Sequence, residues 1–90
     1  MLTVNYSSKF IKSYKKLPHL IQEDFDKKII IFMTNAKDTR LKTHKLKGKL
    51  KSCLSFYLCN GYRVLFEYKF DNSVNLLDIG PHDKYSKWKK

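Results

Sequence analysis

Three apolar runs in the second half of the chain, separated by short turns, constrain its fold more than any other feature. Residues 51–58 and 62–70 place apolar side chains on one face at the two-residue period of a half-buried strand, and residues 74–79 form a third, largely apolar run. An Asn-Gly pair at residues 60–61 and a polar segment at residues 71–73 separate these runs. Because such short turns join neighbouring antiparallel strands, the sequence predicts a three-stranded meander.

The first half of the chain predicts one strand and two helices. Residues 2–6 alternate like a short strand, and Ser7 or Ser8 offers an N-cap for the helix that follows. Apolar residues recur at helical spacing up to Pro18, which ends this helix and suits the start of a second one over residues 19–35. Two helices joined this closely are expected to form an antiparallel hairpin. The predicted helical core residues are Phe10, Tyr14, Ile21, Phe25, Ile29 and Phe32.

The order of these elements defines the predicted fold class. Residues 35–48 are polar and are expected to be mostly loop, which leaves the order β-α-α-β-β-β. The economical packing is an α+β fold of a single domain, residues 1–90, in which the helical hairpin covers one face of a small antiparallel sheet. The first strand is added at an edge of this sheet.

The alternation within residues 62–70 predicts which side chains face the helices. Val64, Phe66 and Tyr68 are expected on the buried side. Arg63 then projects onto the uncovered face. Leu65 lies on the same side as Arg63, which indicates that the uncovered face is not wholly polar.

The chain is strongly basic. Nineteen Lys and Arg residues against eight Asp and Glu residues leave a formal net charge of +11. Such a charge favours a polyanionic partner, which can be nucleic acid, an anionic membrane surface or an acidic protein. No apolar run reaches the roughly 18 residues that span a bilayer, and the first residues lack the pattern of a signal peptide. A cytoplasmic location without membrane attachment is therefore expected.

The two cysteines are interpreted as reduced thiols that pack in the protein. Cys53 and Cys59 are six residues apart in one predicted strand and its turn. At roughly 3.3 Å per residue they would lie about 20 Å apart, which is beyond the reach of a disulfide. The sequence has no Cys-x-x-Cys pair to supply zinc ligands. No metal or cofactor is expected.

Cations gather around the predicted meander. Lys47, Lys49 and Lys51 share one face if their segment is extended, so they either protect a strand edge or follow the phosphates of a nucleic acid. Arg63 supplies a planar, permanently charged group that matches phosphate oxygens. His82 follows the last strand, and histidine is the side chain that titrates closest to neutrality. An imidazole and a guanidinium in one site would suit the cleavage of a phosphodiester.

The ordered set of motifs resembles the RelE/ParE superfamily of bacterial toxins. The resemblance is carried by Lys-Leu-Lys-Gly-x-Leu-Lys at residues 45–51, Tyr-Arg-Val-Leu-Phe-Glu at residues 62–67 and Asp-Ile-Gly-x-His-Asp-x-Tyr at residues 78–85. It is strongest to the RelE/YafQ-like branch, whose members cut messenger RNA on the ribosome. The resemblance implies a RelE-like fold and the toxin of a type II toxin-antitoxin system, which a cognate antitoxin protein neutralises.

The resemblance also implies a set of site residues. Arg63 matches the arginine that holds the scissile phosphate, and His82 matches the position of a catalytic histidine. Tyr85 is similar to a C-terminal aromatic residue that orients a base, although it follows the histidine by three residues instead of four. The implied reaction is metal-independent attack by the RNA's own 2′-hydroxyl, with messenger RNA and ribosomal RNA as partners. The candidate RNA-binding residues are Lys47, Lys49, Lys51 and Lys84.

Alternatives remain open on the residues alone. The superfamily includes ParE-like proteins that block DNA gyrase and have no nuclease activity, and the shifted tyrosine is also compatible with a weakened site. Arg63 can instead pair with Glu67, and His82 can be an exposed or capping residue. His44 is a minor candidate for RNA contact, whereas Trp88 is expected to pack back onto the sheet. The enzyme hypothesis requires the Arg63 and His82 side chains to lie within the span of one ribonucleotide.

Overall fold

The computed structural model describes residues 2–46, 52–70 and 72–88, without the side chains of residues 85–87. Two 3-10 turns, Thr39–Leu41 and Cys59–Gly61, accompany the helices and strands of these ranges. No helix in the described ranges is both long and apolar enough to cross a membrane. The helices and strands are β1 (Thr3–Tyr6), α1 (Ser8–Lys15), α2 (His19–Thr34), β2 (His44–Lys45), β3 (Leu54–Tyr57), β4 (Arg63–Lys69), β5 (Ser73–Gly80) and α3 (His82–Trp88).

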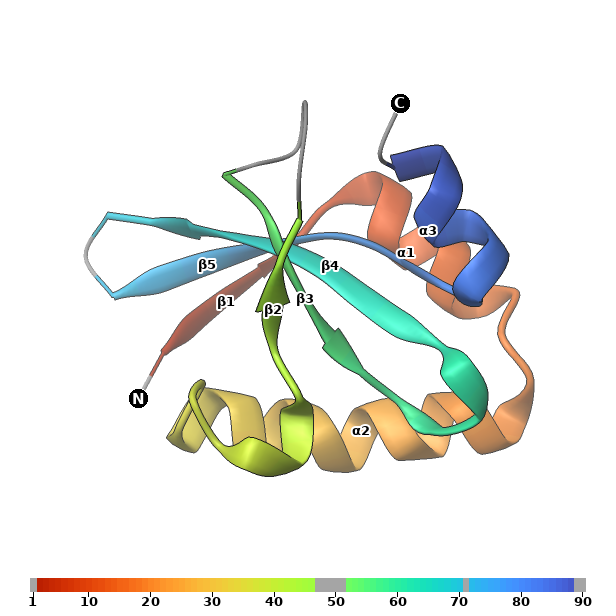
Figure 1. The fold of residues 1–90 in the computed structure, drawn as a ribbon, viewed down its shortest axis with the longest axis horizontal. Coiled ribbons are helices and arrows are strands. Elements are labelled where there is room, and N and C mark those ends of the chain that lie inside the picture. Colours follow the sequence, from red (N-terminus) through yellow and green to blue (C-terminus); the bar gives the residue numbers. More distant parts are fainter. Residues whose placement is uncertain (1, 47–51, 71, 89–90) are drawn as a thin grey trace.

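A five-stranded sheet in the order β1-β5-β4-β3-β2 forms the centre of the fold (Figure 1). β3, β4 and β5 pair antiparallel, which confirms the predicted meander, and β2 extends it beside β3. β1 lies at the opposite edge, as predicted, but it pairs with β5 in parallel. The sheet is therefore mixed, whereas the sequence pattern predicts a wholly antiparallel one. The α+β class and the helical pair packed on the sheet are confirmed.

Two segments without a predicted element form regular structure. Residues 35–48 contain a 3-10 turn and β2, and a strand of two residues is too short to show a period in the sequence. α3 follows β5 directly. Its local signals are Pro81 just before the helix and Asp83 in its first turn, both of which favour a helix start. β3 is also shorter than predicted, because it begins at residue 54 instead of 51.

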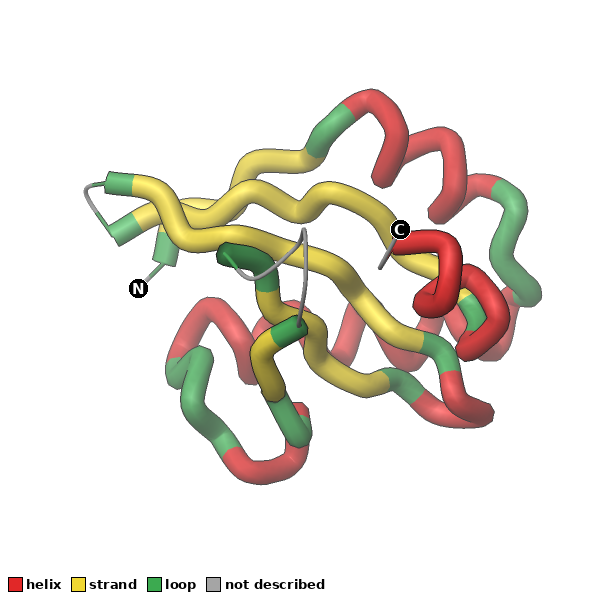
Figure 2. Tube along the Cα trace, turned by 45° about the horizontal axis from the view of Figure 1, so that its top comes forward, coloured by secondary structure: helices red, strands yellow, loops and turns green. Residues whose placement is uncertain are grey.

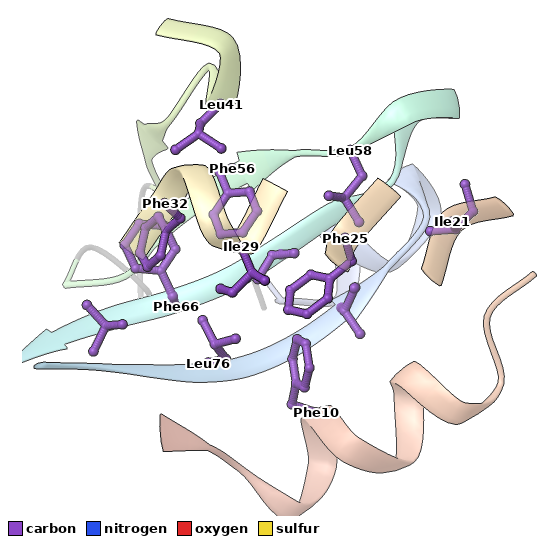
Figure 3. Packing of buried hydrophobic residues seen from close by; sticks show 13 residues of the cluster. Phe10, Ile21, Phe25, Ile29, Phe32, Leu41, Phe56, Leu58, Phe66 and Leu76 are labelled. Atoms are coloured by element: carbon purple, nitrogen blue, oxygen red, sulfur yellow. The ribbon is translucent and has the colours of Figure 1, made fainter. Parts of the chain in front are cut away.

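The helices α1 and α2 enclose the main core against one face of the sheet (Figure 3). The side chain of Ser7 caps α1 by accepting a hydrogen bond from the backbone N–H of Phe10 at 3.0 Å. The rings of Phe10 and Phe25 pack between the two helices, with ring centroids 5.3 Å apart. The ring of Phe32 packs on Phe56 of β3, with ring centroids 5.0 Å apart. The predicted core residues that are buried are Phe10, Ile21, Phe25, Ile29, Phe32, Val64 and Phe66, with Tyr14 partly buried beside them.

The predicted burial of Tyr68 is wrong. Tyr68 is 47% exposed, and Phe70, which follows it on the same side of the strand, is 87% exposed. In Figure 1 the hairpin of β4 and β5 extends past the C-terminal end of α2, so α2 does not cover this end of the sheet. The alternation of a strand predicts the direction of its side chains but not where the helical cover ends.

The other face of the sheet carries a second, smaller apolar cluster. Its buried members are Leu46, Cys53, Leu65 and Trp88, so the uncovered face is partly apolar, as Leu65 indicates. Trp88 packs back from α3 onto the sheet, which confirms its predicted place. Cys53 and Cys59 are both free cysteines.

β5 contains one residue more than the stretch of β4 that it pairs with. Leu65 pairs with Asp78 and Phe66 pairs with Leu76, so Leu77 is the extra residue of a β-bulge. A bulge reverses the alternation of every residue beyond it. Asp78 therefore faces the Leu65 side of the sheet, and Ile79 turns back into the main core.

Candidate functional site

Arg63 and His82 meet where β4 begins and β5 ends. Arg63 is the first residue of β4 and pairs with Gly80, the last residue of β5. The chain then reaches His82 within two residues. Nη2 of Arg63 lies 3.0 Å from Nδ1 of His82. The convergence that the enzyme hypothesis requires is therefore present.

The contact defines which ring nitrogen of His82 faces the guanidinium. An arginine nitrogen can only donate a hydrogen bond, so Nδ1 of His82 is the acceptor. This arrangement requires the tautomer with its proton on Nε2. Arg63 is half-buried and His82 is exposed, so a ligand can reach the imidazole from solvent.

Tyr57 and His44 extend the site across the sheet. Tyr57 of β3 pairs with Arg63, and its ring centroid lies 4.7 Å from the guanidinium carbon, which is a cation–π contact. His44 of β2 packs edge-on against the same tyrosine, with ring centroids 5.2 Å apart. The side chains of His44, Tyr57, Arg63 and His82 thus form a continuous series of contacts, which we call the Arg63 cluster.

Of the two other members of this cluster, the sequence indicates His44 only as a minor candidate for RNA contact, and Tyr57 was not predicted. His44 lies beside β3 because of β2, and a two-residue strand gives no periodic signal. Tyr57 does carry a signal. Its neighbour Phe56 faces the main core, so Tyr57 has to face the side of the sheet to which Arg63 points. Applying the alternation to β3 as well as to β4 would have identified it.

Asp78 ties α3 to α1 and β5 behind the Arg63 cluster. Its side chain is 1% exposed. It accepts hydrogen bonds from Ser13 Oγ at 2.6 Å, the Ile79 backbone N–H at 2.8 Å, Trp88 Nε1 at 3.0 Å and Lys84 Nζ at 3.1 Å. Burial acts to raise the pKa of this carboxyl, but the hydrogen bonds outweigh burial, so the pKa lies below its ordinary value.

Lys84 has partners within the protein. Its ammonium group bonds Ser13 Oγ at 2.9 Å in addition to Asp78. The stem of the Lys84 side chain also packs closely against Gly80 at the end of β5. A larger residue at position 80 would clash with it, because an added Cβ would lie only 2.5 Å from Lys84 Cδ. These contacts hold α3 in place, and because His82 is the first residue of α3 they also position its imidazole. An RNA contact by Lys84 stays a prediction.

Several other sequence candidates stay predictions too. The side chain of Tyr85 lies outside the described residues, although position 85 falls within α3, about one helical turn after His82. The three candidate lysines of the polar segment also lie outside the described residues: Lys47, Lys49 and Lys51.

The alternative ion-pair partner of Arg63 has contacts of its own. Glu67 lies 4.0 Å from the ammonium group of Lys69 and accepts a hydrogen bond from Asn75 at 3.5 Å. Among the residues that the structure describes, no group of three or more His, Cys, Asp or Glu side chains is arranged to hold a metal ion.

Comparison with known proteins identifies the fold. No family model and no curated protein sequence matches the chain. The crystal structure of YafQ from E. coli strain BL21(DE3) matches with a TM-score of 0.77 and 15% identity, over 94% of this chain and 98% of YafQ. The RelB-RelE antitoxin-toxin complex from Methanococcus jannaschii matches with a TM-score of 0.76 and 14% identity, over 96% and 99%. The YoeB-YefM complex from Staphylococcus aureus matches with a TM-score of 0.73 and 19% identity, over 91% and 98%.

The chain therefore has the fold of the RelE/ParE toxins. The resemblance found in the sequence motifs is confirmed at the level of the fold, over more than nine tenths of the chain in each comparison. At these identities the likeness concerns the fold, so the activity has to be argued from the Arg63 cluster.

Proposed function

We propose that this chain is the toxin of a toxin-antitoxin pair and a metal-independent endoribonuclease that cleaves messenger RNA on the ribosome. The observation that carries the proposal is the 3.0 Å contact between Arg63 Nη2 and His82 Nδ1. It brings a permanent cation and a proton-transfer group within reach of one phosphodiester. The net charge of +11 supports a nucleic-acid substrate.

The reaction uses the 2′-hydroxyl of the RNA as its nucleophile. The 2′-oxygen attacks the phosphorus, a 2′,3′-cyclic phosphate forms, and the 5′-oxygen leaves with a proton. Arg63 binds the non-bridging oxygens and stabilises the charge that develops on them. The phosphate thereby replaces Nδ1 of His82 as the partner of the guanidinium, and the released imidazole transfers a proton.

Two imidazoles flank the pair of Arg63 and Tyr57, which provides one group for each proton transfer. His82 contacts Arg63, and His44 contacts Tyr57 from the other side. In an in-line displacement the 2′-oxygen and the 5′-oxygen lie on opposite sides of the phosphorus. Proton-transfer groups on both sides of the central cation suit this geometry, so we include His44 in the proposed site.

The partners in this proposal are messenger RNA, the ribosome and a cognate antitoxin, in the cytoplasm. The solved structures of RelB-RelE and YoeB-YefM are complexes of a toxin with its antitoxin, and their shared fold supports an antitoxin partner for this chain. The four lysines predicted from the sequence remain the candidates for further RNA contact.

The test is cleavage of a messenger RNA during translation in a purified system. We expect Arg63→Gln and His82→Gln each to lower the cleavage rate by about 10²- to 10⁴-fold, because each removes a group that acts in the transition state. His19→Gln is the matched control, since His19 is an exposed histidine at the start of α2. Circular dichroism checks that each variant is folded.

Two outcomes would contradict the proposal. Cleavage within threefold of the wild-type rate in both site variants would remove the catalytic assignment. Gyrase-dependent DNA breaks together with intact messenger RNA would favour the ParE-like alternative, which has no nuclease activity.

A further inference from the structure

A pocket of about 370 Å³ opens between α1 and the turn that joins β5 to α3. Gly80 and Pro81 line it, and they are the two residues just before His82. Gly80 also pairs with Arg63. The pocket and the Arg63 cluster therefore share this turn as a common wall. Figures 1 and 2 both place α1 and α3 at this end of the sheet.

Lysines surround the pocket. Lys9 and Lys12 of α1 and Lys16 at its C-cap are spaced three and four residues apart and line the pocket together, and Lys84 reaches the pocket from α3. Asp78 lies 3.7 Å from Lys9 and 3.1 Å from Lys84. Neither Lys12 nor Lys16 forms an ion pair with any residue that the structure describes. Four ammonium groups and one carboxylate leave the pocket with three positive charges.

The remaining surface of the pocket is largely apolar. Leu17 and Tyr62 are half-buried, and Ile79 is fully buried next to them. An apolar surface with an aromatic ring below exposed lysines matches a nucleotide, whose base has a flat face and whose phosphate is an anion. An inorganic anion or a peptide of acidic residues alone would use the lysines but not this surface.

We propose that this pocket is a subsite for one nucleotide of the RNA strand, next to the phosphodiester held by Arg63. The proposal rests on the ribonuclease function proposed above. Lys12 and Lys16 bind the phosphate of this nucleotide, and the surface of Leu17 and Tyr62 holds its base. The subsite orients the strand across the Gly80–Pro81 turn and takes no part in the proton transfers.

The test separates binding from cleavage. A fluorescein-labelled single-stranded hexaribonucleotide is titrated with each protein, and anisotropy gives Kd at several salt concentrations. We expect the double variant Lys12→Gln/Lys16→Gln to bind at least tenfold more weakly, with the slope of log Kd against log salt reduced by about 0.7 for each lost phosphate contact. Lys27→Gln/Lys37→Gln is the matched control, because it removes the same charge from exposed positions. The control is expected to change Kd less than threefold.

A second pair of variants tests the place of the base. Tyr62→Leu is expected to weaken hexaribonucleotide binding about fivefold or more, whereas Tyr62→Phe keeps the aromatic ring and binds like the wild type. In the translation system, Lys12→Gln/Lys16→Gln is expected to raise KM and leave kcat unchanged. Circular dichroism confirms the fold of both Tyr62 variants.

Three outcomes would overturn the subsite. Equal losses in the pocket and control variants would show that RNA binding follows total charge. Equal losses of RNA and of a hexaglutamate peptide would assign the pocket to acidic peptides. If Tyr62→Leu bound the hexaribonucleotide as tightly as the wild type, the base would not bind against Tyr62 in this pocket. Failure of the ribonuclease function has a different signature, because the wild type would then bind the hexaribonucleotide through the pocket without cleaving messenger RNA.

Discussion

Replacement of Asp78 by asparagine is expected to destabilise the protein by about 2–4 kcal/mol at neutral pH. Oδ1 of Asp78 accepts hydrogen bonds from Ser13, Ile79 and Lys84, and Oδ2 accepts one from Trp88 Nε1 at 3.0 Å. Asparagine has a single side-chain oxygen, so with that oxygen in the place of Oδ1 its amide nitrogen would face the buried N–H of Trp88. The unsatisfied donor accounts for about 1–3 kcal/mol, and the lost charge next to Lys84 for the rest. The melting temperature should fall by roughly 8–32 °C.

The same variant tests the direction of the pKa shift. The pKa of Asp78 in the folded protein lies below its ordinary value of 3.8. The carboxylate therefore stabilises the fold above about pH 4, and this contribution is lost as the pH falls through the folded-state pKa. Asparagine gains no proton, so the difference in unfolding free energy between the two proteins should shrink between pH 7 and about pH 2. Urea unfolding followed by far-UV circular dichroism measures this difference in unfolding free energy at both pH values.

Asp26→Asn is the control for this experiment. Its carboxylate accepts a hydrogen bond from the Tyr14 hydroxyl at 2.9 Å, but it is exposed, so the substitution should change stability by less than about 1 kcal/mol. An Asp78→Asn protein within about 0.5 kcal/mol of the wild type at pH 7 would refute the role of this carboxylate as the anchor of α3. A difference that is the same at both pH values would refute the pKa argument.

Two further substitutions test the cap of α1 and the support of Arg63. Ser7→Ala should lower the unfolding free energy, measured by urea unfolding, by about 1 kcal/mol. The Ser7 hydroxyl accepts a hydrogen bond from the Phe10 N–H and donates one to the Leu77 carbonyl oxygen at 3.0 Å. An equal loss of stability in Ser8→Ala would contradict this reasoning. Tyr57→Leu should slow RNA cleavage about 2- to 30-fold, since a cation–π contact contributes about 0.5–2 kcal/mol to holding Arg63. Tyr57→Phe keeps the ring and should cleave at the wild-type rate in the same assay, and a loss as large as that of Tyr57→Leu would point to the hydroxyl instead.

The pairing of Arg63 with the end of β5 could be predicted from the sequence. The polar segment predicted as a turn at residues 71–73 makes the two flanking strands antiparallel, so the start of one lies near the end of the other. Alternation then directs Arg63 away from the core residues Val64 and Phe66. These two rules together place His82 near Arg63, whereas the register that sets Arg63 opposite Gly80 also depends on the bulge at Leu77, which alternation does not predict.

The elements that the sequence did not predict depend on contacts between distant segments. β2 exists because His44 and Lys45 pair with β3. α3 is held by the bonds from Trp88 and Lys84 to Asp78, which also accepts a hydrogen bond from Ser13 of α1. None of these contacts leaves a periodic pattern within its own segment.

The bulge at Leu77 has a consequence for how chains of this fold vary. It divides β5 into two halves, of which the first supplies Val74 and Leu76 to the aromatic interior and the second supplies Asp78 and Gly80 to the opposite side. Ile79 also follows the bulge and points into the main core, so a substitution there affects the interior, whereas Asp78 lies on the side of the sheet that carries α3. A homologue that lacks this insertion would have a single residue between Leu76 and Ile79, still opposite Leu65, and an apolar residue at that position would leave its last helix without the anchor that Asp78 provides here.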